Sequence, residues 1–159
     1  MPMRRRGRTG RLVGGALALA VLLATVAGAD GPSPGTVAPS VPPSAERHFQ
    51  EGLEAQKAGD WRRAVEAYRA AIKSREAFPE AWNGLGFSLR QQGRYAEAIQ
   101  AYDRALRLRP NYAEALEYLG EAYVKMGKLA EARRVLQRLE PLAADEATDL
   151  REAIRKAGR

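Results

Sequence analysis

The sequence contains no cysteine and only one histidine among its 159 residues. Without cysteine, the chain forms no disulfide bond and offers no thiolate to a metal ion or as a nucleophile. His48 stands alone, whereas a histidine-based metal or catalytic site needs further ligands or partners. The sequence also has no glycine-rich phosphate-binding loop. We therefore expect no catalytic residue, no metal site, no cofactor and no small-molecule substrate.

Acidic residues are absent from residues 1–29, and this absence changes the meaning of the net charge. The chain has 26 Lys and Arg against 19 Asp and Glu, a formal charge of +7. Five of the arginines lie in residues 1–29, so the rest of the chain carries only +2. A nucleic-acid partner requires a basic face on the folded domain. We therefore expect no nucleic-acid partner.

Residues 1–29 have the three parts of a secretory signal. A basic run leads into the apolar stretch 12–29, which ends in the small residues Ala27, Gly28 and Ala29 before Asp30. The interpretation is a cleaved signal peptide that sends a bacterial protein to the periplasm or outside the cell. The alternative is an uncleaved inner-membrane anchor that faces the periplasm, although the stretch is at the short end of the roughly 17–25 residues needed to span a bilayer. Membrane contact is expected only through residues 12–29.

Residues 30–44 contain five prolines among glycine, serine and threonine. Proline removes backbone donors and fixes the backbone, so this composition predicts an extended, semi-rigid linker.

From residue 45 onward, small residues recur at an interval of 34. This interval is typical of stacked helix pairs, in which glycine and alanine allow the helices to approach closely. The period predicts repeats over 45–78, 79–112 and 113–144, and an amphipathic helix over 145–159. The residues in phase are Gly52, Gly86 and Gly120; Gly59, Gly93 and Gly127; and Ala64, Ala98 and Ala132.

The second unit carries the clearest motif. Its residues in order are Trp82, Leu85, Gly86, Leu89, Ala98, Tyr102, Ala105 and Pro110. This pattern resembles the tetratricopeptide repeat, with Leu89 in place of a tyrosine. The resemblance covers residues 45–144 and implies an all-α fold. The expected architecture is an α-solenoid of three tetratricopeptide helix hairpins plus a C-terminal capping helix.

In this family the first helix of each repeat lines a concave binding groove. The resemblance therefore implies an apolar floor from Phe49, Leu53 and Phe87 at one end of the groove. An acidic strip that includes Glu117 and Glu121 would lie at the other end, although a simple solvated face is the alternative for these two. The full set of expected partner-binding residues is Phe49, Leu53, Asn83, Phe87, Arg90, Glu117 and Glu121.

Chaperone-binding members of the family clamp a C-terminal carboxylate with lysine, asparagine and arginine side chains. None of the corresponding residues here is of that kind. The resemblance therefore argues against chaperone tails and favours a protein or peptide segment with apolar and basic residues. The corresponding positions are Phe49, Leu53, Gly84, Glu114 and Tyr118.

Together these patterns predict a non-catalytic protein-interaction adapter of the periplasm or envelope. The alternative is a membrane-anchored assembly subunit of an envelope, secretion or cofactor-biogenesis complex. A self-assembling structural protein is a third class, in which Phe49 or Phe87 would be buried between copies.

Overall fold

Seven α-helices and no strand make up residues 44–159, the part of the chain that this computed structural model describes. The predicted signal segment 1–29 and nearly all of the predicted linker 30–44 lie outside the described residues. Within residues 44–159, no helix is both long enough and apolar enough to cross a membrane.

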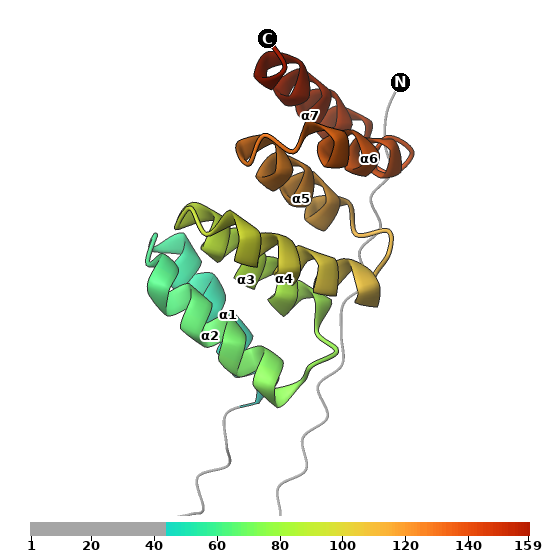
Figure 1. Cartoon of the computed structure of the whole chain (residues 1–159). Helices are drawn as coiled ribbons and strands as arrows, with labels where there is room; N and C mark the ends of the chain where they lie inside the picture. Colours follow the sequence, from blue (N-terminus) through green and yellow to red (C-terminus); the bar gives the residue numbers. More distant parts are fainter. Residues whose placement is uncertain (1–43) are drawn as a thin grey trace, which may run out of the picture. The chain divides into compact units, whose positions relative to one another are not determined.

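The helices pack in consecutive pairs that stack on one another (Figure 1). Each first helix packs against the second helix of its own pair, and the second helix then packs against the next pair. The predicted all-α class and the solenoid of helix hairpins are therefore confirmed. The helices are α1 (Ala45–Lys57), α2 (Trp61–Ser74), α3 (Pro79–Gln91), α4 (Tyr95–Leu108), α5 (Ala113–Lys125), α6 (Leu129–Leu139) and α7 (Ala144–Ala157).

The turn inside each hairpin is built on a glycine with a left-handed backbone. The φ angles of Gly59, Gly93 and Gly127 are 72°, 74° and 70°. Only glycine adopts this region without a steric cost, which is why the three positions are in phase. After the first of these glycines, Asp60 accepts a hydrogen bond from the backbone N–H of Arg63 at 3.0 Å and caps α2.

Inside the stack, the in-phase glycines make room for aromatic rings. The Tyr102 ring fills the space over Gly86, so that a Cβ added there would lie 2.6 Å from the ring. The repeat spacing predicts that glycine and alanine allow the helices to approach closely. The structure shows that the freed volume over Gly86 is occupied by Tyr102, which is fully buried, as is Ala98.

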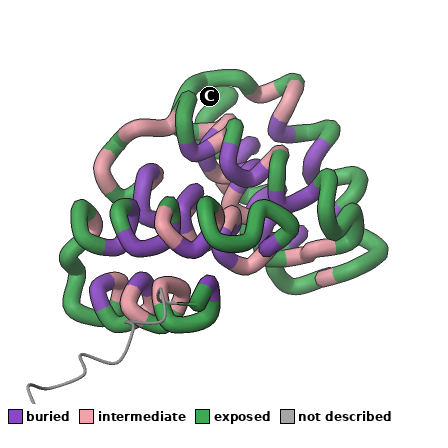
Figure 2. Tube along the Cα trace, turned by 90° about the horizontal axis from the view of Figure 1, so that it is seen from below, coloured by how far each residue is buried: buried purple, intermediate pink, exposed green. Residues whose placement is uncertain are grey.

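Helix α7 closes the last repeat. It packs on both α5 and α6, and Leu150 occupies the space over Gly120 that a tyrosine of a second helix fills in the earlier repeats. Leu150 and Ile154 are buried on its apolar side. In Figure 2 the helices carry buried residues on the sides that meet neighbouring helices and exposed residues on the outward sides.

Candidate functional site

Residues of α1, α3 and the start of α5, together with Tyr68 of α2, surround a cavity of about 130 Å³, which we call the first-helix cavity. It brings together four of the residues predicted from the sequence: Phe49, Leu53, Asn83 and Phe87. The complete lining is Phe49, Leu53, Gln56, Tyr68, Glu80, Asn83, Gly84, Phe87, Tyr112 and Glu114.

Aromatic rings support the walls of this cavity. Phe49 packs against Phe78 and Tyr68, with ring centroids 4.8 and 5.7 Å apart. Phe87 packs against Tyr118 at 5.2 Å. Because both phenylalanines are only half-buried, part of each ring remains available to a ligand.

Hydrogen bonds join several of the polar side chains that line the cavity. The Tyr68 hydroxyl donates to Gln56 Oε1 at 2.9 Å, and the Tyr112 hydroxyl donates to Glu114 at 3.3 Å. Asn83 Nδ2 donates to the Tyr112 oxygen at 3.4 Å. Its other amide atom, Oδ1, is buried and has no hydrogen-bond partner among the described residues. Since buried polar atoms are nearly always paired, this acceptor is unusual.

The two carboxylates at the cavity differ in their charge partners. Burial raises the pKa of Glu80, but its hydrogen bond and ion pair with Arg109 outweigh this effect and hold the pKa below its usual value. The same pairing occurs in the first repeat, where Arg75 lies 2.5 Å from Glu46. Glu114 has the equivalent position in the third repeat, but Ala143 stands where the arginine would be. Among residues 44–159, no cation forms an ion pair with Glu114.

Tyr112 also lines the cavity, and burial raises the pKa of its hydroxyl to about 12. The negative charges of Glu114 and Glu80 act in the same direction. The Tyr112 hydroxyl therefore stays protonated at neutral pH and remains a donor to Glu114.

Arg90 and Glu121 lie away from this cavity. They form an ion pair at 2.5 Å and line a separate hollow of about 480 Å³ beside α7. The Arg90 guanidinium also lies over the Phe87 and Tyr118 rings, 5.2 and 5.1 Å from their centroids. The acidic strip suggested by the sequence is thus neutralised in part from within the molecule.

Glu117, the remaining predicted site residue, lines neither hollow. It is half-buried, and its pKa is raised by burial first and then by the charges of Glu121, Glu146 and Glu114. The charged form of this side chain is therefore disfavoured in the folded protein.

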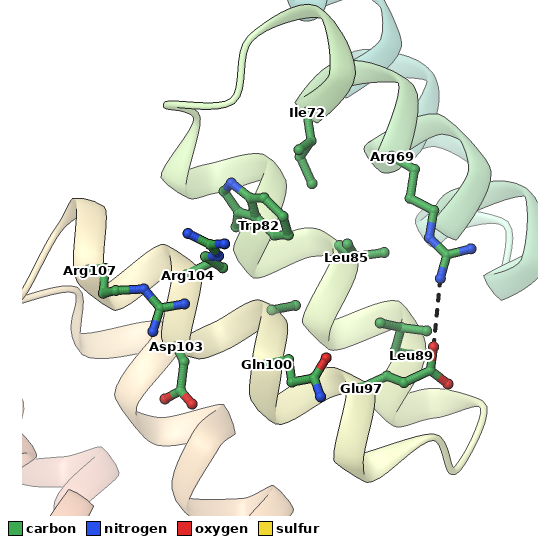
Figure 3. Close-up of a pocket in the computed structure, with 11 residues that line it drawn as sticks. Arg69, Ile72, Trp82, Leu85, Leu89, Glu97, Gln100, Asp103, Arg104 and Arg107 are labelled. Atoms are coloured by element: carbon green, nitrogen blue, oxygen red, sulfur yellow. Dashed lines mark ion pairs between the residues drawn. The ribbon is translucent and has the colours of Figure 1, made fainter.

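A different groove lies between α2 and α4, on the second helices of the first two repeats (Figure 3). Its volume is about 560 Å³, and its floor includes Trp82, Leu85 and Leu89. Arg69 crosses it to an ion pair with Glu97 at 3.7 Å. The charges that line it are mixed, and Arg69 with Glu97 is the one ion pair that the described residues form within this lining.

Residues 44–159 contain no cluster of three His, Asp or Glu side chains that could hold a metal ion. His48 is half-buried, and its Nδ1 lies 3.2 Å from a Glu51 carboxylate oxygen. The contact with Glu51 gives His48 a structural role in α1.

Sequence reasoning did not single out Tyr112 or Tyr68 as site residues. The spacing held a signal for Tyr112, because it stands 34 residues after Phe78 at the end of a repeat. Glu80 and Glu114 lie at the starts of first helices, where acids interact well with the helix dipole. Both also line the first-helix cavity.

Two models of the tetratricopeptide repeat match the chain, one over residues 49–113 and the other over residues 89–156. The chain belongs to the tetratricopeptide repeat family. No curated protein matches it.

Solved structures show the same fold. The TPR2B domain of yeast Sti1, in a complex with Hsp70, is 24% identical with a TM-score of 0.67, over 72% of this chain and 95% of that one. The first TPR of Spaghetti (RPAP3) bound to the HSP90 peptide SRMEEVD is 22% identical with a TM-score of 0.68, over 73% and 94%. The Arabidopsis OM64 TPR domain is 21% identical with a TM-score of 0.68, over 71% and 95%.

The positions that form the carboxylate clamp in chaperone-binding members of the family can be located in this structure. Four of the five corresponding positions, Phe49, Leu53, Gly84 and Glu114, line the first-helix cavity. Tyr118 does not line it. The cavity therefore occupies the clamp position but carries no lysine or arginine.

The raised pKa of Glu117 makes a prediction about stability. A carboxyl whose pKa is higher in the folded state than in the unfolded state destabilises the fold at pH values above both. We expect Glu117→Gln to raise the melting temperature at pH 7, because it removes this cost. The gain should shrink as the pH falls through the folded pKa and vanish below the ordinary value of 4.5. Thermal melts monitored by circular dichroism between pH 3.5 and 7 measure it.

The matched control is Glu54→Gln, at an exposed position of α1 that makes no ion pair among the described residues. It should leave the melting temperature nearly unchanged at every pH. A Glu117→Gln variant that melts below wild type at pH 7 would contradict the assignment.

Proposed function

We propose that this protein is a non-catalytic adapter that holds a segment of a partner protein against the side of α1, α3 and α5 that contains the first-helix cavity. We call this side the first-helix surface. The observation that carries the proposal is the meeting of Phe49, Leu53, Asn83 and Phe87, from two different repeats, around one accessible cavity. Half-exposed aromatic rings next to a few polar groups are typical of peptide-binding sites.

Structural relatives support this reading. The yeast Sti1 domain is seen with Hsp70, and the Spaghetti domain holds an HSP90 peptide. A second TPR domain of human RPAP3 is seen with the HSP70 peptide SGPTIEEVD. Proteins with this fold are thus known to bind peptide segments.

The partner proposed here differs from those acidic peptides. Glu114 and Phe49 stand at positions where the chaperone-binding members carry basic groups, so a carboxylate would meet a like charge and no lysine or arginine. A segment with apolar and basic residues fits the first-helix surface better.

Site-specific photo-crosslinking tests the proposed surface. Phe87 is replaced by p-benzoylphenylalanine, which keeps an aromatic ring at the cavity wall. We expect this variant of the full chain, irradiated in intact cells, to form a discrete covalent adduct with a partner protein, detected by mass spectrometry.

The matched control places the same photo-reactive residue at Leu108, which is 43% exposed on α4. It should yield little or none of that adduct. If the adduct forms from Leu108 and not from Phe87, the binding surface lies on the second helices and the proposal fails.

We further propose that the adapter acts in the periplasm or is secreted, after removal of residues 1–29. The support is the sequence of that segment: five arginines, an apolar stretch and small residues before Asp30. The second candidate is a subunit that keeps residues 12–29 as an inner-membrane anchor and organises an envelope, secretion or cofactor-assembly complex.

Fractionation with N-terminal sequencing separates these two roles. We expect the mature chain in the periplasmic or secreted fraction with Asp30 as its first residue. An intact N-terminus in the membrane fraction would support the anchored subunit instead. A full-length chain in the cytoplasmic fraction would contradict both.

A further inference from the structure

We infer that the outward side of the second helices, α2, α4 and α6, binds a lipid surface that carries anionic phosphate headgroups. We call this side the second-helix surface. The inference goes beyond the proposed adapter function, and it adds a membrane contact to the one expected from the sequence through residues 12–29.

The charges of the folded part are divided between its two sets of helices. The three second helices carry nine Arg or Lys against four Asp or Glu, a net charge of +5. The first helices, α1, α3 and α5, carry four Arg or Lys against seven Asp or Glu, a net charge of −3. The two ends of a helix dipole have opposite partial charges, so the dipoles leave these totals unchanged. The chain after residue 29 thus has a small net charge because a basic side and an acidic side offset each other.

The cations of the second-helix surface are accessible to a ligand. All nine are exposed, and Arg69 is the only one of them that forms an ion pair within residues 44–159, with Glu97 at 3.7 Å. The nine are Arg62, Arg63, Arg69, Lys73, Arg104, Arg107, Arg133, Arg134 and Arg138.

The second helices follow one another closely enough for their outward side chains to meet. Arg69 of α2 reaches Glu97 of α4. Arg138 of α6 donates a hydrogen bond at 3.2 Å to the backbone oxygen of Pro110, which lies just after α4. The basic side chains therefore extend over three successive repeats of the stack (Figure 1).

The position of these cations favours a broad anionic surface over an inserted peptide segment. Only Arg69, Arg104 and Arg107 line the groove between α2 and α4, where Glu97 and Asp103 accompany them. The other six cations lie outside that groove on exposed parts of the helices. A bilayer presents phosphates over a wide area, so it can contact these six without a groove.

The side-chain chemistry and the N-terminal sequence favour lipid among polyanions. Eight of the nine cations are arginines, whose planar guanidinium binds two phosphate oxygens at once. The sequence of residues 12–29 predicts an export signal or an anchor, and either brings the chain to a bilayer. In the anchored form, residues 30–43 span at most about 50 Å, so the folded part stays beside the membrane. Contact through the second helices leaves the first-helix cavity free for the partner segment.

Site-resolved modification of arginine tests this contact on the full chain. Phenylglyoxal reacts with free guanidinium groups, and mass spectrometry of the peptides gives the reaction rate at each arginine. The chain is mixed with vesicles of phosphatidylcholine alone, or of phosphatidylcholine with about one third phosphatidylglycerol. Apolar contacts of residues 12–29 are the same with both kinds of vesicle, so a difference between them reports on charge.

We expect the anionic vesicles to slow the modification of Arg104, Arg107 and Arg134 by about fivefold, because a contact of that strength leaves each group free for about a fifth of the time. About 1 M NaCl should remove this protection by screening. Arg47 of α1 is equally exposed and is the internal control, which should react at one rate with both vesicles.

Three outcomes would overturn the inference. The first is equal rates at the second-helix arginines with both vesicles, as expected if only the N-terminal arginines bind. The second is equal slowing at Arg47. The third is protection by a DNA duplex and not by the anionic vesicles, which would make nucleic acid the ligand.

Two double variants connect affinity to this side of the molecule. Arg104→Gln with Arg134→Gln removes two cations from the second-helix surface, whereas Arg47→Gln with Lys125→Gln removes the same charge from the first helices. Each basic group near an anionic bilayer contributes about fivefold in affinity, so the first variant should reduce the binding gained from phosphatidylglycerol by about 25-fold in vesicle flotation. The second variant should keep that gain.

Equal losses in both double variants would mean that net charge alone controls binding, and would overturn the assignment to the second helices. All four replaced side chains are exposed and make no ion pair within residues 44–159, and circular dichroism melts check that the variants fold. Crosslinking from Phe87 is measured separately, so failure of the lipid contact is distinguishable from failure of the adapter function.

Discussion

The insertion of the Tyr68 ring between the first-helix residues Gly52 and Gly84 supports both the fold and the site. A Cβ added at either glycine would lie 2.5 Å from this ring. Tyr68 comes from α2, so its ring joins α1, α2 and α3 at one point and links the first repeat to the second. The side chain is fully buried, and its hydroxyl donates to Gln56 at the edge of the first-helix cavity. The contact that stacks two repeats therefore also builds a wall of the candidate site, and it explains why the clamp position holds Gly84 and no side chain.

A second recurring contact sets the charge of the site. In the first two repeats, a glutamate at the start of the first helix pairs with an arginine after the second helix, as Glu46 does with Arg75. The same arginines lie over the aromatic residue that precedes the next repeat, with Arg75 3.7 Å from the Phe78 ring centroid. The third repeat has Ala143 in place of the arginine, so Glu114 has no such partner among the described residues. Glu114 thus differs from Glu46 and Glu80, which hold the equivalent positions and have an arginine partner.

The hairpins could be predicted from the sequence because the glycine and alanine spacing encodes contacts between neighbouring helices. The family resemblance also predicted that Phe49 and Phe87 meet at one end of the first-helix surface. The pairing of Arg90 with Glu121 could not be predicted, since it joins side chains of two repeats whose distance depends on the packed stack. The unpaired Asn83 oxygen could not be predicted either, because its burial and orientation depend on groups from several helices. That Glu114 lacks an arginine partner could in principle be predicted, because Ala143 stands at the arginine position.

The central claim, that the close fit of an aromatic ring against glycine holds the repeats together, is tested most directly by equilibrium unfolding of Gly84→Ala. Alanine in a helix normally stabilises by about 0.5–1 kcal/mol relative to glycine. Here the added methyl group would collide with a buried ring that is held by a hydrogen bond, so the account predicts a loss of about 1–3 kcal/mol in the free energy of unfolding. Gly158→Ala, where an added Cβ finds its nearest neighbours at 3.5 and 3.6 Å, is the control and should cost nothing. A Gly84→Ala protein as stable as wild type, or more stable, would contradict the account.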